Sequence, residues 1–558
     1  MRIGLLAVAA LVLATSTAVA ADPPIVFQTQ PLGRVLDEVR AGADILGGEK
    51  AVKAFNDSLK NLLGEKGVEG MDVGRPVVGY VVLAPKPADV TAVIALPITN
   101  EKEFLDLCER ANKQKPKLAG EEKDVYELPP LDPRYKALMR FSNRYAYIAY
   151  GANPSPHLAA AALVPMAKLY DPAERGLVAV RVHFDRIPPA VKEAAPVLFE
   201  EVKKTVFGGR GLGQQEMEFL KPVIAELDKL AARYVKLSAG ADVLTARLIL
   251  DVPGGGLVAE ATLTAKPDSE LAKMIAAFKP TANKFAALVD HPDTIAGFKF
   301  RVPLFEEELR AAAAAGLESG RKEVMKGAPA AGKAALEEMF QGLMRTVKTG
   351  EFDLVAAVRG PDKNDWYTAV GAVAFDDPAK LEKEFRAFVE KDAPPDVAEA
   401  IKWDAAKAGT VSIHTWKITP GGFIDVTKVF GGESCLVAFA FAPHGVFAAI
   451  GPDAANTLKG ALVVKPAAAP VLDLVANPAR VVKLFKKINP NDPDSDMAER
   501  ILGKEDKLKS LASLKLEGGK ELKATFTIDL KTFPRYWVSG FSVGGAAKPP
   551  PPPEVDKD

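Results

Sequence analysis

The apolar and polar positions along the chain fall into short strand-like runs, and helical patterns separate pairs of these runs. Residues 75–83 and 90–96 have strand character around a turn that contains two prolines, and residues 100–112 repeat apolar side chains with helical spacing. The same hairpin-then-helix order returns in residues 352–391. This order predicts antiparallel hairpins with helices inserted between them.

Further segments also occur twice. The strand-like run at 144–151 has a counterpart at 445–451, and the hairpin pattern at 245–265 has one at 512–529. Matched positions follow the same order in both parts of the chain: Phe104 with Phe385, Gly151 with Gly451, and Thr262 with Thr525. Since the spacing between the matches varies, a tandem duplication with loop insertions and deletions explains them better than a short-period repeat.

Helical patterns flank these units. Residues 31–63 predict a pair of helices, and the alanine-rich residues 305–327 and 331–350 predict two more, broken near Pro329. The expected fold is α+β: a tandem duplication of an antiparallel-sheet module with covering helices, joined by a helical connector. The expected segments are a signal peptide (1–20), a helical pair (21–70), a first repeat (71–290, with subunits 71–170 and 175–290), the helical connector (291–349), a second repeat (350–543, with subunits 350–465 and 466–543) and a proline-rich disordered tail (544–558).

One strand-like run predicts which side chains are buried. Residues 178–185 alternate strictly between apolar and polar side chains. We expect Val178, Val180, Val182 and Phe184 to face the core, and Arg181, His183 and Asp185 to face solvent.

The N-terminus and the charge balance limit where the protein acts. Arg2, the apolar residues 3–14 and the small residues 18–20 have the order of a cleaved export signal, so we expect a periplasmic or extracellular protein. The chain has 72 basic and 72 acidic residues, which does not favour a nucleic-acid partner. No later stretch is long and apolar enough to predict a membrane span.

The two cysteines predict buried small side chains. Cys108 lies on the apolar face of a predicted helix, and Cys435 alternates with apolar residues along a predicted strand. An oxidising compartment permits a disulfide between them, but spacing alone does not predict one.

No motif predicts catalysis or a cofactor. The segment around Ser434 lacks the G-x-S-x-G pattern of a nucleophile elbow. The five histidines have no metal-binding spacing: His157, His183, His291, His414 and His444. We expect His157 and His291 to be solvated, and His444 to occupy a hairpin turn at the place where the first copy has Arg144. No catalytic residue is predicted.

Two loops have compositions that resemble ligand sites. Asp492, Asp494 and Asp496 resemble the start of a calcium loop, but Met497 and Gly503 stand where such a loop needs glycine and a bidentate acid. These aspartates are weak metal candidates. The glycine-rich residues 208–213 follow a predicted helix, whereas phosphate-binding loops follow a strand. Both loops fit variable surface connections better.

Tyrosines mark one face of a strand. Tyr145 and Tyr147 share a face of the run at 144–151, which predicts either a half-buried sheet surface or an exposed binding surface.

Residues 70–82, 93–107 and 145–151 carry a resemblance to a known class of proteins. With these segments the chain resembles large exported bacterial proteins of unknown function that are built from duplicated α+β modules. The likeness covers much of residues 70–280 and, more loosely, the second half. It implies a fold, and it brings no catalytic residues.

The expected function is therefore non-catalytic. We expect an exported binding or scaffold protein whose duplicated sheets contact a protein partner or an apolar ligand, without a cofactor. The alternatives are a hydrolase-type enzyme with a site assembled from distant loops, and a lipid carrier. A pocket with convergent acids or histidines would favour the enzyme, whereas a broad apolar groove between the halves would favour binding.

Overall fold

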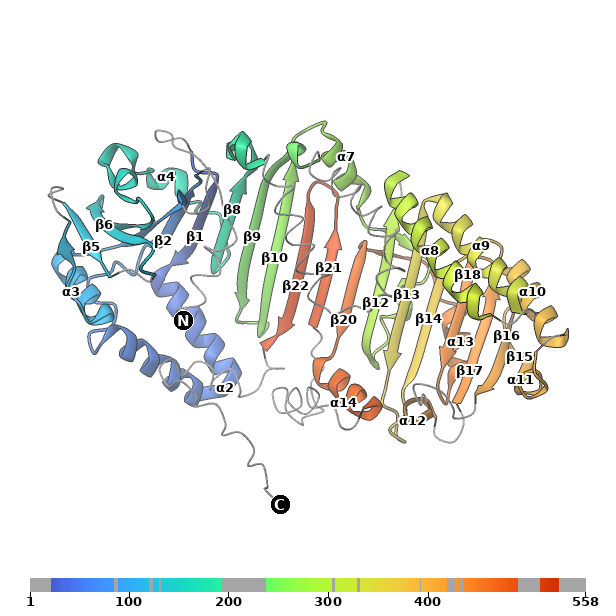
Figure 1. Ribbon diagram of the computed structural model, residues 1–558. Helices are drawn as coiled ribbons and strands as arrows, with labels where there is room; N and C mark the ends of the chain where they lie inside the picture. Colours follow the sequence, from blue (N-terminus) through green and yellow to red (C-terminus); the bar gives the residue numbers. More distant parts are fainter. Residues whose placement is uncertain are drawn as a thin grey trace, which may run out of the picture.

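The structure is a computed structural model of the whole chain. It describes residues 22–84, 89–119, 124–129, 132–192, 237–303, 307–328, 332–391, 393–418, 427–431, 435–489 and 512–530. Helices and a large antiparallel sheet together make an α+β fold (Figure 1).

Twenty strands form one continuous sheet. From one edge to the middle they are β4 (Lys117–Leu118), β5 (Val125–Leu128), β6 (Lys136–Ser142), β7 (Tyr145–Gly151), β3 (Thr91–Pro97), β2 (Pro76–Val82), β1 (Ile25–Pro31), β8 (Val178–His183), β9 (Ala241–Asp251) and β10 (Gly256–Ala265). From the other edge they are β15 (Ile401–Ala408), β16 (Val411–Ile418), β17 (Cys435–Ala442), β18 (Gly445–Ile450), β14 (Thr368–Ala374), β13 (Glu351–Arg359), β12 (Thr294–Pro303), β20 (Leu472–Ala476), β21 (Ala512–Glu517) and β22 (Leu522–Asp529). Strands β10 and β22 pair with each other and join the two halves.

The two halves order their strands in the same way. If the ten sheet strands of each half are numbered in chain order, both halves give the order 4-5-6-7-3-2-1-8-9-10 from edge to join. A separate ribbon pairs β11 (Thr281–Asn283) with β19 (Ala467–Ala469).

Helices occupy equivalent places in the two halves. The first two strands are connected by α2 (Leu32–Leu63) in one half and by α8 (Glu307–Gly327) and α9 (Lys333–Thr349) in the other. The third strand leads into α3 (Glu101–Asn112) or α10 (Pro378–Lys391). The remaining helices are α4 (Met166–Leu169), α7 (Glu270–Ala277), α11 (Pro395–Ala400), α12 (Thr427–Phe430), α13 (Ala454–Leu462) and α14 (Pro478–Ile488), and the short 3-10 turns are η2 (Ser155–Leu158), η3 (Ala160–Ala162), η4 (Phe184–Arg186), η5 (Ser238–Gly240) and η6 (Ala286–Leu288).

Local sequence explains where the two covering helices start. The Asn100 side chain accepts a hydrogen bond from the Glu103 amide, and the Asp377 side chain accepts one from the Lys380 amide. Both are N-cap interactions that satisfy otherwise unpaired amides at the helix start, and Pro378 follows at the first helical position.

The middle of the sheet has two chemically different faces. Successive residues of a strand point to opposite faces, and residues opposite each other in antiparallel strands share a face. The apolar face carries a row made of Leu248, Ala259, Phe526, Leu514 and Leu474. The polar face carries Arg247, Glu260, Lys523, Lys515 and Asp473.

The outer parts of the sheet are covered on both faces. On the apolar face, α3 packs over β6 and β7 in one half, and α10 and α11 pack over β15 to β17 in the other. On the polar face, η2 and α4 cover Tyr80 and Tyr147, and α13 with η6 covers Phe447. Most of the hydrophobic core therefore lies at the two ends of the sheet, on both of its sides, and a smaller cluster lies under α7 at one end of the middle strands.

Two predicted helical segments contain strands. Residues 25–31 lie in the segment predicted as a helical pair, but they form β1, where Gln28 and Gln30 are buried. Residues 294–303 lie in the predicted connector, but they form β12. Helix α2 contains both predicted helices, and its backbone kinks at Gly47 and Gly48.

The burial predicted for residues 178–185 is confirmed at its end, where Phe184 packs against a core cluster and Asp185 is exposed, but it is wrong for the strand itself. The run alternates, but Ala179 on the polar face is only 1% exposed, whereas Val178, Val180 and Val182 on the apolar face are half-buried. The reason is that the segment before β8 packs on the polar face. There the Arg181 guanidinium donates hydrogen bonds to the side chains of Gln28 and Asp171.

Candidate functional site

Among the residues that the structure describes, the middle of the apolar face is covered only at its margins. The helices that pack on this face lie mainly over the outer strands. α7 reaches the middle near Leu263 and Leu522, and α2 reaches it where Gly42 lies against Leu250 of β9. Figure 1 shows β10, β22, β21 and β20 between these helical ends. Phe526 is 41% exposed and Leu474 is 37% exposed. Contiguous exposed apolar surface of this kind marks interaction sites on proteins.

A furrow crosses this open face. Ala296, Ala476 and Ala512 lie opposite one another on β12, β20 and β21 and form a floor of small side chains. The neighbouring row consists of the large side chains Phe298, Leu474, Leu514 and Phe526, which form a wall. The resulting groove has a volume of about 460 Å³. No charged side chain is among its described lining residues.

The furrow has the dimensions of an acyl chain. It crosses five strands, β13 to β22, and neighbouring strands lie about 4.8 Å apart, so its length is about 19 Å. One acyl chain spans about half of a bilayer core that is ~30 Å thick, or about 15 Å. The groove volume also falls within the usual range of small-molecule sites, about 300–1,000 Å³.

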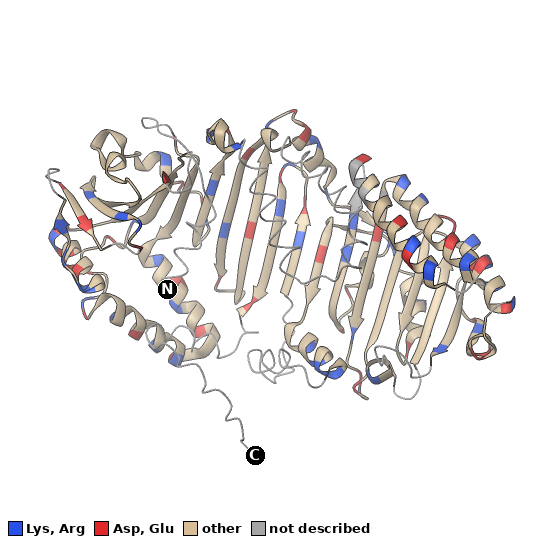
Figure 2. Ribbon diagram, viewed as in Figure 1, with Lys and Arg blue, Asp and Glu red and all other residues tan. Residues whose placement is uncertain are grey.

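The polar face is neutralised by ion pairs. Arg247 contacts Glu174 at 3.1 Å and Glu260 at 2.6 Å, and Glu260 also pairs with Lys523 across the join. Figure 2 shows basic and acidic positions interspersed over these middle strands. Because these four charges compensate one another, the join offers no strong local field for a charged ligand.

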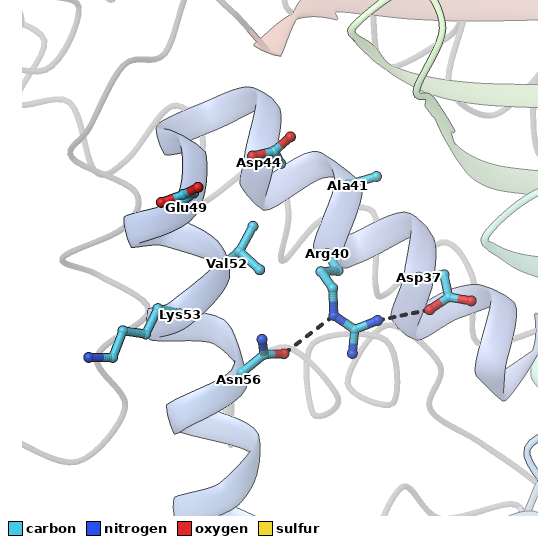
Figure 3. Close-up of a pocket in the computed structure, with 8 residues that line it drawn as sticks. All are labelled: Asp37, Arg40, Ala41, Asp44, Glu49, Val52, Lys53 and Asn56. Carbon is cyan, nitrogen blue, oxygen red and sulfur yellow. Dashed lines mark hydrogen bonds and ion pairs between the residues drawn. The ribbon is translucent and has the colours of Figure 1, made fainter.

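A second depression lies between the two arms of the kinked α2. Its volume is about 580 Å³, and its acids are Asp37, Asp44 and Glu49. Figure 3 shows that these carboxylates do not converge on one point. The Arg40 side chain extends into the space and contacts Asp37 at 2.8 Å and Asn56 at 3.3 Å (Figure 3). This charged crevice therefore lacks the paired carboxylates of an acid–base site.

One histidine has an environment that the sequence did not reveal. His414 on β16 is fully buried under α10. Its Nε2 lies 3.3 Å from a Glu382 carboxylate oxygen, and its Nδ1 accepts a hydrogen bond from the Asp404 amide. Burial lowers the pKa of His414. Since substrate cannot reach a fully buried ring, the cluster is not a candidate active site. The available sequence signal for burial was that His414 lies two residues before Trp416, and therefore on the same face of the strand as this large aromatic side chain.

The other histidines are peripheral. His444 occupies the two-residue turn between β17 and β18, exposed, where β6 and β7 have Arg144 in their turn, so this prediction is confirmed. His291 is exposed, as predicted. His157 is half-buried in η2, and burial lowers its pKa, so the prediction that it is solvated is wrong.

The two cysteines are free thiols in separate halves of the sheet. Cys108 lies on the buried face of α3, and Cys435 lies on β17. Burial raises the pKa of each thiol to about 11. They are inert core side chains rather than a disulfide or a nucleophile.

The tyrosine face is part of a core. Tyr145 and Tyr147 are 5% and 1% exposed and pack against Tyr80 on the polar side of the first half. Burial raises the pKa of Tyr147 to about 12. These side chains are therefore unavailable as a binding surface.

Three features considered from the sequence lie outside the described residues: the weak metal candidates Asp492, Asp494 and Asp496, the glycine-rich residues 208–213, and Ser434. Within the part of the chain that is described, no group of three His, Cys, Asp or Glu residues is arranged to hold a metal ion. None of the helices described here is both long and apolar enough to cross a membrane.

The furrow on the apolar face thus remains the candidate functional site, and the sequence alone did not reveal it. Its floor comes from β12, β20 and β21, and its wall adds β22, so only the strand pairing brings these residues together. Comparisons with protein families, curated proteins and solved structures found no match for this chain.

Proposed function

We propose that this protein is an exported, non-catalytic binding protein that holds the acyl chain of a lipid in the furrow on its apolar face. The observation that carries the proposal is the row of small side chains beside a row of large, partly exposed apolar ones. Such a floor and wall provide a linear apolar contact without a charged group that would have to be desolvated.

The expected affinity is moderate. Each buried methylene contributes about 0.8 kcal/mol, but a chain in an open furrow buries only the side that touches the protein. We expect a Kd on the order of 10–100 µM, similar to the weak membrane binding of a single acyl chain. A carrier with such a site would load and release its ligand readily.

We also propose that the two halves arose by tandem duplication. The shared strand order supports this, and so do two equivalent close contacts. A Cβ atom on Gly151 would lie 2.7 Å from the Thr91 hydroxyl oxygen, and one on Gly451 would lie 2.7 Å from that of Thr368. In the first half this glycine is the last residue of the seventh strand, and in the second half it directly follows that strand; each lies against the threonine that begins the third strand. Such a duplication would produce one wide sheet. The strand pair β10–β22, which joins the two halves, would then create a surface that neither half has alone.

Export is part of the proposal, and it rests on the sequence of residues 1–20. Amino-terminal sequencing of the protein purified from its own cells tests it. A mature chain that begins at Ala21 is expected. A retained Met1 would contradict export by this signal.

Titration with a long-chain fluorescent fatty acid tests the binding proposal. The variant Ala476→Phe fills the furrow floor and should weaken binding at least tenfold. Ala246→Phe is the matched control, because Ala246 is an exposed alanine on the same face outside the furrow. It should change the Kd less than twofold. An unmodified protein that binds no acyl chain, or equal effects of the two variants, would refute the proposal.

A further inference from the structure

His414 is positioned to hold the edge strand of the sheet. Strand β15 is the last strand on its side, and β16 is its one sheet neighbour among the described strands. His414 lies on β16, fully buried, with its ring 4.9 Å from Trp403 and 5.2 Å from Phe439 between ring centroids. In Figure 1 these strands lie at one end of the sheet, beside α10.

The edge strand depends on one unusual turn of its backbone. The register between β15 and β16 shifts between Lys402 and Ala406, which is a β-bulge. Within it, Asp404 has a φ of +54°, a conformation that non-glycine residues rarely adopt. The Asp404 amide donates a hydrogen bond to Nδ1 of His414 at 3.1 Å. Together with the contact between the Asp404 carboxylate and Ser412 of β16, the imidazole therefore holds the bulge against β16.

This hydrogen bond requires one protonation state. Nδ1 accepts from an N–H donor, so it carries no proton of its own, and the proton of the neutral ring lies on Nε2. Nε2 lies 3.3 Å from Glu382 without hydrogen-bond geometry. A proton on Nδ1 would place two donors against each other and end the bond from Asp404.

Three charged groups face the ring. Glu382 and Arg386 approach from α10, and Asp404 approaches from β15. Arg386 contacts Glu382 at 2.8 Å and Asp404 at 3.1 Å, and its guanidinium also stacks 4.3 Å from the centroid of Trp403. Strand β17 contributes the aromatic rings of both Phe439 and Phe441 to the same site. The two acids are thus already engaged by one arginine.

We propose that His414 is a pH-sensitive latch: protonation of its Nδ1 breaks the bond from the Asp404 amide and releases the bulged part of β15 from β16. The release is local, because the rest of the sheet does not depend on this contact. It is independent of the furrow, which lies on other strands.

The direction of the pH dependence follows from the burial of the ring. Burial is the largest influence on His414, and it lowers the pKa below the ordinary value of 6.5. The released strand, where the ring is solvated, therefore binds the proton more readily than the closed strand. The closed form is fully favoured above about pH 6.5, and it loses stability as the pH falls through this value and towards the lowered pKa.

Hydrogen exchange of the full chain tests the latch. After correction for intrinsic rates, protection of residues 402–406 should fall at least tenfold between about pH 7.5 and about pH 5, while β13 and β14 keep theirs. His414→Asn keeps an acceptor for the Asp404 amide but cannot titrate, so its protection should not depend on pH. His444→Asn, at the exposed turn histidine, is the control and should behave like the unmodified protein.

A second measurement needs no variant. In protein labelled with ¹⁵N-histidine, the Nδ1 resonance of His414 should show an unprotonated nitrogen near neutral pH and should titrate together with the loss of protection. A pH-independent β15, a variant His414→Asn that keeps the pH dependence, or an Nδ1 that carries the proton at neutral pH would each overturn the proposal.

Discussion

Glu260→Gln should weaken the join between the two halves of the sheet. Glu260 on β10 is 2.6 Å from Arg247 and pairs with Lys523 on β22. Its side chain is only 10% exposed, whereas that of Lys523 is 34% exposed. A charged pair in this setting lies between an exposed pair, worth about 0.2–1 kcal/mol, and a buried pair, whose breakage costs about 3–5 kcal/mol.

The expected loss in the free energy of unfolding depends on which charged groups each substitution leaves without a partner. Glu260→Gln removes the partner of two cations and should cost about 2 kcal/mol. Lys523→Met should cost about 1 kcal/mol, because Glu260 keeps Arg247 as a partner. The double variant should cost about 2 kcal/mol rather than the sum, since Lys523 has already lost its partner in Glu260→Gln.

Urea unfolding followed by circular dichroism measures these differences as a double-mutant cycle. An exposed ion pair in α8 provides the control: Glu323 and Lys326 are 3.0 Å apart, with side chains 60% and 73% exposed. The same pair of substitutions there should cost less than about 0.5 kcal/mol in total. Strictly additive effects at the join would show that the Glu260–Lys523 contact does not stabilise it.

Three further predictions concern the core. Gly451→Ala should destabilise the protein by about 2 kcal/mol in urea unfolding, because Gly451 has a φ of +143° and an added Cβ would meet backbone atoms. As the control, Gly460→Ala in α13 places its Cβ in open space and should stabilise the protein by up to about 1 kcal/mol. Phe447→Ala should cost about 3–5 kcal/mol, since this ring is 6% exposed and packs in the core of the second half; a loss under 1 kcal/mol would contradict that packing. Cys108 and Cys435 should not react with a thiol reagent until denaturant is added, and two thiols should then appear; reaction in the native state, or no thiols after unfolding, would be inconsistent with two buried free cysteines.

Hairpins and covering helices could be predicted because their signals are local. Residues 75–112 specify two strands, a turn and a capped helix within a short stretch, and the structure has β2, β3 and α3 there. Strand β1 was not predicted, and its polar residues Gln28 and Gln30 interrupt the apolar pattern of the strand. In the structure their amides are buried, and each donates to a backbone carbonyl, of Asp171 and Glu174 respectively. Such long-range partners leave no local pattern.

The furrow could not be predicted, because no single strand contains it. Ala296, Ala476 and Ala512 are unremarkable alanines until the register places them opposite one another. The same holds for Arg247 and Glu260, whose pairing with Lys523 depends on the order of strands at the join. Sequence periodicity reveals which residues of one strand share a face, but not which strand becomes its neighbour.

The join between β10 and β22 also affects how the chain is made. Ala261 of β10 finds its partner, Ala524, only near the end of the described chain. During synthesis, therefore, β10 keeps an unpaired edge until nearly all of the second half has emerged, and unpaired edges attract other strands. A nascent chain of this protein must be shielded from association with its neighbours for longer than one that closes each sheet as it grows.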